Sequence, residues 1–288
     1  MFYLLLSIIF STLLVVIFKL FDKYRIHTLQ AIVFNYLTAA TLGFSLTRLD
    51  ISINELTHRY WFPNAVLIGI LFISLFYVIA LTAQQISVSV ASVANKMSVV
   101  IPVGAAFYLY NDTPTWSKII GIILALIGVV LASIKKEKSK ISLRAYLWPI
   151  LLFVGSGFLD TYMKYTQHYY LTDADTIYFI PVLFSIAAFT GIIILIWYLA
   201  LNPSKFQWKS FPAGMILGIC NYASIYFLLK SLQIPNMESS ILFSLNNLGI
   251  VIASAFVSNF AFKNYLSRNN WIGVVLSVLA IILIMMNI

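Results

Sequence analysis

Long apolar stretches alternate with short polar segments along the whole of this chain. Most stretches run for about 20 residues, the length that a helix needs to cross roughly 30 Å of hydrocarbon. Runs such as Ile119 to Leu131 do not alternate apolar and polar residues with a period of two, as the strands of a membrane β-barrel do. The pattern predicts ten membrane-spanning helices, at about 2–21, 28–47, 62–83, 88–110, 117–134, 145–165, 174–200, 211–232, 237–260 and 269–287.

Composition excludes a soluble fold. Of the 288 residues, 61% are hydrophobic and 9% are charged, whereas a soluble domain carries roughly 25% charged residues. The first span has no basic residues before it and no small-residue cleavage site after it, so we expect a retained helix and not a signal peptide. We therefore expect a multi-pass protein of the inner or plasma membrane, with the lipid bilayer as its partner.

The formal charge of +9 comes from Lys and Arg residues in short loops, and such charge sets membrane orientation. We expect no nucleic-acid partner. The side that holds both termini carries Arg48, Arg59 and Lys118. The opposite side carries Lys23, Arg25, Lys135, Lys136, Lys138, Lys140, Arg144, Lys205, Lys209, Lys263 and Arg268. Because positive loops stay in the cytoplasm, this bias predicts that both termini lie outside.

The two halves of the chain repeat one another. Three pairs of segments match in the same order: Gln85-Ile86 with Gln233-Ile234, Trp116–Leu131 with Trp271–Leu283, and Ser11–Lys19 with Ser156–Lys164. The repeats run over residues 1–138 and 139–288, and each holds five spans. A second copy of a five-span unit enters the membrane from the opposite side. The predicted fold is therefore an all-α membrane protein of ten transmembrane helices, arranged as two inverted five-helix repeats, a plan that recurs among secondary transporters.

Several motifs resemble those of the drug/metabolite transporter superfamily, in particular its EamA-like family. They are Lys19 and Lys164 near the end of the first span of each half, Ala80-Leu81, Ser87-Val-Ser89, Pro102, Trp116 with Gly121, and Trp271 with Gly273. The Gly-Glu pair that usually precedes the fifth span of a half is Asn111-Asp112 and Phe262-Lys263 here. The resemblance covers almost the whole chain, and it implies export or exchange of amino acids, sugars, nucleotides or related metabolites.

Enzyme motifs are missing from the sequence. There is no H-E-x-x-H, no G-x-S-x-G and no G-x-x-x-x-G-K, and the histidines His27, His58 and His168 lie in or beside loops. The single cysteine, Cys220, allows no disulfide or thiol metal site. We expect no catalytic residue, no metal and no cofactor. Without a phosphate-binding loop, a gradient is the expected energy source.

Lys96 is the sharpest candidate for a site. Ionisable residues inside spans are costly and mark pathways, and Lys96 lies well inside span four beside Asn95. Ser89, Ser92 and Lys96 recur at helical spacing and share a face. Pro102, farther along, loosens the backbone. We interpret Lys96 as a cation that holds a substrate carboxylate or phosphate, with a structural ion pair or snorkelling to an interface as the alternatives.

Three further ionisable groups could couple an ion to transport or form structural pairs. Asp160 and Lys164 are four residues apart on span six, so they share a helical face and can pair or relay a proton. Glu238 opens span nine, where the helix dipole alone favours a carboxylate. Lys19, the repeat counterpart of Lys164, is placed in the substrate cavity, with snorkelling as the alternative.

Amides and glycines complete the set of candidates. Asn246 lies deep in span nine, and Asn221-Tyr222 and Asn35-Tyr36 offer polar groups in spans eight and two. We expect Asn246, Asn221 and Tyr222 to line the substrate cavity, with a hydrogen bond between helices as the alternative for Asn246. Gly214-x-x-x-Gly218 in span eight, and Gly121 and Gly128 in span five, allow close helix approach. A homodimer seam through spans five and ten is an open alternative.

These features predict a secondary-active transporter of a small polar metabolite that works by alternating access. Its central cavity is expected between the halves, lined by spans one, three, four, six, eight and nine. The cationic side chains favour a substrate that carries a carboxylate or phosphate. Amino acids are expected first, followed by organic anions and nucleotide-linked metabolites. A non-transporting receptor or scaffold, a channel, and an intramembrane enzyme are the alternatives.

Overall fold

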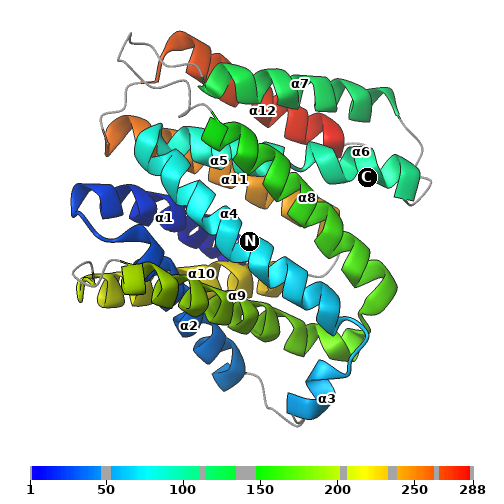
Figure 1. The fold of residues 1–288 in the computed structure, drawn as a ribbon. Helices are drawn as coiled ribbons and strands as arrows, with labels where there is room; N and C mark the ends of the chain where they lie inside the picture. Colours follow the sequence, from blue (N-terminus) through cyan, green and yellow to red (C-terminus); the bar gives the residue numbers. More distant parts are fainter. Residues whose placement is uncertain are drawn as a thin grey trace. The chain divides into compact units, whose positions relative to one another are not determined.

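The computed structural model describes residues 2–46, 53–109, 115–133, 147–201, 206–232, 239–262 and 266–285. Within these ranges every regular element is a helix (Figure 1). The helices are α1 (Phe2–Lys23), α2 (Thr28–Leu46), α3 (Ile53–Thr57), α4 (Phe62–Gln85), α5 (Val88–Met97), α6 (Val100–Leu109), α7 (Trp116–Ser133), α8 (Leu147–Tyr170), α9 (Asp173–Leu201), α10 (Ser210–Leu232), α11 (Ser239–Phe260) and α12 (Arg268–Met285).

Each of the ten predicted spans coincides with one helix, except the fourth, which α5 and α6 share. The short helix α3 lies in the loop between spans two and three. Within the described ranges, six segments are long and apolar enough to cross a membrane, and shorter apolar stretches occur in α7, α11 and α12. The crossing segments are Phe2–Lys23, Thr28–Leu46, Phe62–Gln85, Val88–Ala105, Tyr178–Leu201 and Ser210–Ser231. The chain is a multi-pass helical membrane protein; the full count of ten crossings stays a prediction.

The helices form two compact units. Unit 1 comprises Met1–Leu20, Val78–Phe158 and Ala223–Ile288, and unit 2 comprises Phe21–Tyr77 and Leu159–Tyr222. Each unit takes helices from both halves of the sequence, and α1, α4, α8 and α10 contribute residues to both units. The predicted repeats, at 1–138 and 139–288, therefore do not fold as separate compact bodies, and the duplication itself stays a prediction.

The core of unit 1 forms where α5, α7, α11 and α12 pack together. Val93, Met97, Ala125, Val251 and Val274 are among its buried side chains. α7 lies along α12 (Figure 1) because glycines let the two backbones approach. A Cβ at Gly128 would lie 3.0 Å from the carbonyl oxygen of Gly273 and 2.6 Å from Ser277 Oγ. The small residues of spans five and ten thus face each other within one chain. The sequence had also allowed the alternative that these two spans form the interface of a homodimer.

One side chain joins the end of α7 to the start of α12. Ser267 and Asn270 form a reciprocal cap: the Ser267 amide donates to Asn270 Oδ1 at 2.9 Å, and the Asn270 amide donates to Ser267 Oγ at 3.2 Å. Asn270 Nδ2 then donates to the carbonyl oxygens of Ala132 and Leu131, at 2.7 and 3.2 Å. These carbonyls belong to the last turn of α7 and would otherwise lack intrahelical donors.

In unit 2, α2 packs against α9 and also against the glycine face of α10. A Cβ at Gly214 would lie 2.5 Å from the Ala31 carbonyl oxygen, and one at Gly218 would lie 2.6 Å from the Asn35 carbonyl oxygen. The predicted close approach at these two glycines is confirmed, and the partner helix is α2.

Hydrogen bonds join the start of α2 to the segment before α10. The His27 amide donates to Gln207 Oε1 at 3.2 Å, and the Gln207 amide donates to Gln30 Oε1 at 2.9 Å. His27 Nε2 lies 3.0 Å from the Tyr198 hydroxyl of α9. Paired in this way, polar groups at one end of unit 2 satisfy each other where the helices leave the apolar region.

Candidate functional site

The candidate site begins with α5, which a serine caps. Ser87 has an extended backbone with φ −168°, and its Oγ accepts a hydrogen bond from the Val90 amide at 3.1 Å. This is the usual geometry of an N-cap. From there the helix carries Ser89 and Ser92 into the interior of unit 1, where both are buried. The predicted polar stripe therefore turns inward along the first two turns.

The helix of span four is interrupted directly after this stripe. α5 ends at Met97, Ser98 and Val99 form a turn, and α6 starts at Val100. Pro102 has no N–H for the carbonyl of Ser98, four residues earlier, and its ring crowds that carbonyl. The Ile101 amide bonds to the Ser98 carbonyl instead, at 2.9 Å, and Ser98 Oγ donates to the Asn95 carbonyl at 2.5 Å. The expected loosening of the backbone is confirmed, one turn before the proline.

Two buried polar atoms close to this region have no hydrogen-bond partner in the protein. They are Oγ of Ser92, which is 1% exposed, and Oδ1 of Asn246, which is 3% exposed. Ser92 lies on α5 and Asn246 on α11, and these two helices pack against each other in unit 1. An unmade hydrogen bond at a buried polar group costs about 1–3 kcal/mol. Such atoms are what a site for a polar ligand leaves open.

Lys96 and Asn95 lie half-buried in the last turn of α5. A cation is favourable there on electrostatic grounds, because the last carbonyls of a helix carry partial negative charge. The same turn ends at the interruption, so Lys96 lies in the part of α5 where the backbone leaves its regular hydrogen bonding. The structure places four predicted residues, Ser92, Asn95, Lys96 and Asn246, on the two packed helices α5 and α11.

Lys19 has a partner that the sequence did not reveal. Its Nζ donates to the Gln84 carbonyl oxygen at 2.7 Å, and Gln84 Nε2 donates to the Phe18 carbonyl oxygen at 3.0 Å. The two bonds join the ends of α1 and α4 within unit 1. Gln85, the next residue, accepts a bond from Trp148 Nε1 at 3.0 Å. In the sequence, Gln85-Ile86 served only as a marker of the repeat. The two adjacent glutamines, Gln84 and Gln85, at the end of an apolar span were the signal that could have revealed these hydrogen bonds.

Asn221 and Asn35 meet in unit 2. Asn221 Nδ2 donates to Asn35 Oδ1 at 3.3 Å, which joins α10 to α2, and both residues are buried. Tyr36 is also buried, and its hydroxyl has no partner in the protein. Tyr222 is half-buried. The amide of Asn221, which the sequence placed in the substrate cavity, thus already bonds to a neighbouring helix.

The predicted coupling residues are placed unequally. Asp160 and Lys164 lie four residues apart on α8 and are both exposed on the protein surface. Glu238 lies outside the described residues. Across the described part of the chain, no group of three His, Cys, Asp or Glu side chains could hold a metal ion.

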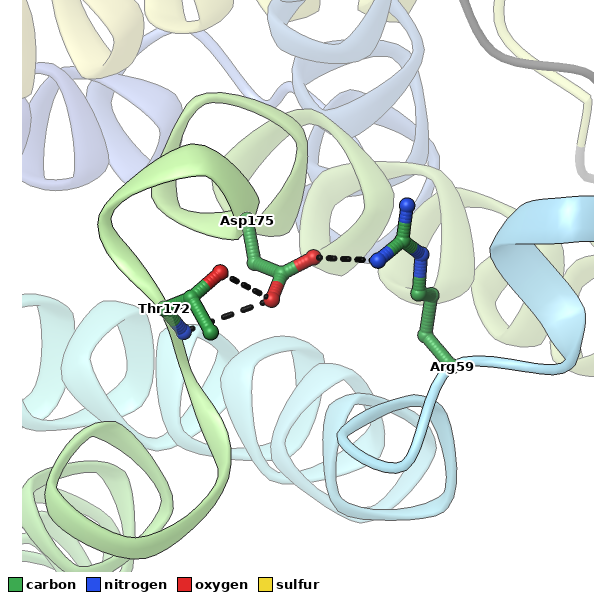
Figure 2. A network of polar contacts seen from close by, with 3 residues as sticks. All are labelled: Arg59, Thr172 and Asp175. Carbon is green, nitrogen blue, oxygen red and sulfur yellow. Dashed lines mark hydrogen bonds and ion pairs between the residues drawn. The ribbon is translucent and has the colours of Figure 1, made fainter.

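A carboxylate that precedes the crossing segment Tyr178–Leu201 is held by a polar network in unit 2. Figure 2 shows Asp175 between Thr172 and Arg59. Thr172 donates to Asp175 Oδ2 from its hydroxyl at 2.6 Å and from its amide at 3.3 Å, and Arg59 Nη1 lies 3.5 Å from Oδ1. Burial alone would raise the pKa of Asp175, but the hydrogen bonds from Thr172, with the charge of Arg59, lower it below its usual value.

Residues 1–134 match the sequence profile of the EamA-like transporter family. The first half of this chain is therefore similar to that family. The EamA-like family lies within the drug/metabolite transporter superfamily, as the motifs had indicated, and it is a family of multi-pass membrane transporters. The chain is also 28% identical over 281 residues to an uncharacterized protein of Haemophilus influenzae, and the aligned region covers 96% of this chain and 94% of that protein.

Proposed function

We propose that this EamA-like chain is a secondary-active transporter that moves a small polar metabolite across the membrane by alternating access. The observation that carries the proposal is the interrupted helix of span four. Discontinuous helices line substrate sites in many secondary transporters, because their free backbone groups and helix ends face the ligand. Here the interruption lies within one turn of Lys96.

The chemistry of the neighbouring groups supports an anionic or zwitterionic substrate. Lys96 offers a cation, and Ser92 Oγ and Asn246 Oδ1 are buried polar atoms with no partner in the protein. An ammonium or hydroxyl of the substrate could donate to Asn246, while its carboxylate or phosphate binds Lys96. Ser92 can donate or accept. Amino acids fit this set best, and organic anions or nucleotide-linked metabolites come next.

Lys19 enters the proposal in a different role from Lys96. Its ammonium already donates to the Gln84 carbonyl, so we propose that it positions α1 against α4 beside the site. Proton coupling is proposed for Asp160 or Glu238, since a carboxylate that titrates during the cycle can exchange a proton for substrate. Two inverted repeats at 1–138 and 139–288 would supply the two exchanging conformations.

The first test is ligand binding, followed by flux. Purified protein in nanodiscs is heated in the presence of a metabolite set that contains the common amino acids, organic acids and nucleotides. The ligand that raises the unfolding midpoint is then assayed for counterflow in proteoliposomes. We expect Lys96→Gln to weaken its apparent affinity about tenfold or more, because a hydrogen bond to a charged group contributes about 1.5–3 kcal/mol. Lys96→Arg keeps the charge and should retain part of the affinity.

Lys230→Gln is the matched control, since Lys230 lies at the end of α10 against the Tyr226 ring and should not alter binding. Unchanged affinity in Lys96→Gln would remove Lys96 from the site. Flux that grows linearly with concentration would favour a channel, and no midpoint shift with any metabolite would favour a receptor or scaffold. The same counterflow, run across a pH gradient, should lose its pH dependence in Asp160→Asn combined with Glu238→Gln.

A further inference from the structure

An apolar groove runs along the surface of unit 1 between α11 and α12. Its volume is about 250 Å³. In the part of the chain that the structure describes, the lining residues come from these two helices: Ile252, Ala255, Phe256, Trp271, Val274, Val275, Val278 and Leu279. Val274 and Ala255 are buried and form its floor, while Phe256, Val275 and Leu279 are exposed and form its rim. In a membrane-spanning helix, such a rim faces lipid.

The two ends of the groove differ, because an aromatic pair lies at one of them. α11 and α12 are antiparallel neighbours, and Phe256 meets Trp271 in an edge-on ring contact with centroids 6.0 Å apart. This aromatic pair lies at the end of the groove closest to the start of α12. From Trp271 to Leu279 the helix rises about 12 Å, close to one leaflet's half of the roughly 30 Å hydrocarbon core.

A cation lies beyond the aromatic end. Arg268 is the first residue of α12 and is exposed. Arg268, Trp271, Val275 and Leu279 recur at helical spacing, so the guanidinium and the groove share one face of α12. The loops on this side of the membrane carry most of the Lys and Arg, and such loops face the leaflet that is rich in anionic lipids.

We infer that this groove binds a single anionic phospholipid, with one acyl chain between α11 and α12 and its phosphate on Arg268. The wall of the groove consists of aliphatic side chains and aromatic rings and exposes no polar atom to it, so it matches an acyl chain better than a polar metabolite. Arginine holds a phosphate through paired N–H groups, and Arg268 lies about one helical turn before Trp271, the aromatic end of the groove. This site is independent of the transport proposal.

The test uses the fluorescence of Trp271. Protein is placed in nanodiscs with one copy per disc, in phosphatidylcholine that contains a small fraction of brominated phosphatidylglycerol or brominated phosphatidylcholine. The signal of Trp271 is the difference between wild type and Trp271→Phe, a change that keeps an aromatic ring against Phe256. We expect half-quenching of this signal at a several-fold lower fraction of phosphatidylglycerol than of phosphatidylcholine.

Two variants separate the headgroup from the chain. Arg268→Gln should abolish the preference for phosphatidylglycerol, and Val275→Phe, which fills the groove, should reduce quenching by both lipids. Lys209→Gln, a basic residue on the same predicted side, and Val130→Phe, an exposed valine of α7, should change neither result. Equal quenching by both lipids in wild type, or a preference that survives Arg268→Gln, would overturn the site. Shielding of Trp271 from both lipids would show that a second copy of the chain covers the groove.

Discussion

At the scale of single residues, Asp175 shows how a buried charge is stabilised where the chain leaves the apolar region. Its side chain is 8% exposed, whereas that of Arg59 is 45% exposed. The short hydrogen bond from Thr172 is therefore shielded from water, and the Arg59 ion pair is partly screened. Exposed ion pairs contribute about 0–1 kcal/mol. We infer that Thr172 stabilises the carboxylate more than Arg59 does, although the charge pair is the more visible contact.

This lowered pKa gives stability a definite dependence on pH. A carboxyl whose folded-state pKa is depressed stabilises the protein above its unfolded pKa of about 3.9, and this stabilisation is lost as pH falls through the folded pKa. We expect Asp175→Asn to lower stability at pH 7 by about 1–3 kcal/mol and to flatten the acid part of the profile. Thermal unfolding followed at a series of pH values measures both effects.

Two graded variants serve as the comparison. Thr172→Val keeps the shape of the side chain but removes the hydroxyl donor, so it should cost most of what Asp175→Asn costs. Arg59→Gln should cost less. The reverse order would mean that the ion pair, and not the threonine, holds the carboxylate in its charged form.

At the scale of elements, substituting helical glycines by alanine is expected to change the stability of the protein in opposite directions at two positions. A Cβ at Gly273 would lie 2.7 Å from the Gly128 carbonyl oxygen and closer still to the Ala132 nitrogen, whereas one at Gly104 would meet nothing within 4 Å. Gly273→Ala should therefore destabilise the protein by about 1–3 kcal/mol through overpacking. Gly104→Ala should stabilise it by up to about 1 kcal/mol, because it only removes backbone freedom. The unfolding midpoints of the two variants measure both effects. Equal responses of the two variants would contradict the packing of α7 on α12.

The elements could be predicted well from the sequence because apolar length alone sets a spanning helix. The one interruption, at Ser98 and Val99, was signalled by Pro102 but was placed only by the structure. The hydrogen-bond partners of individual side chains could not be predicted in this way. Lys19 and Gln84 lie 65 positions apart, and no periodicity links them. Ser92 and Asn246 could be placed on helices from sequence, but their lack of a partner is a property of packing. The Ser267–Asn270 cap was overlooked, although a serine followed three residues later by a polar side chain before an apolar run is its usual signal.

At the scale of the whole molecule, equivalent spans of the two predicted repeats pair with each other. α2 packs on α9, α5 on α11 and α7 on α12, which are the second, fourth and fifth spans of each half. Pairing of like with like is what a two-fold relation between halves produces, and it supports the inverted repeat. Each such pair lies within a single unit.

This arrangement predicts where exposed residues lie relative to the membrane. Tyr60 is 90% exposed and Trp208 is 79% exposed, and five expected spans separate them. In a Cys220→Ser background, a membrane-impermeant maleimide should label Tyr60→Cys in intact cells and Trp208→Cys only after permeabilisation. Labelling of both in intact cells would contradict the odd number of spans between them. The reversed result would keep that number but place the termini inside.

The hydrogen bonds between Asn270 and the end of α7 also bear on the order of events while the chain is synthesised. Ala132 and Asn270 are 138 positions apart, so a ribosome that adds about 5–20 residues per second needs roughly 7–28 s to deliver the second after the first. During that interval the last carbonyls of α7 have water or lipid headgroups as their neighbours. The amide that satisfies them arrives with the final helix, so synthesis of the last span completes the hydrogen bonding of the fifth.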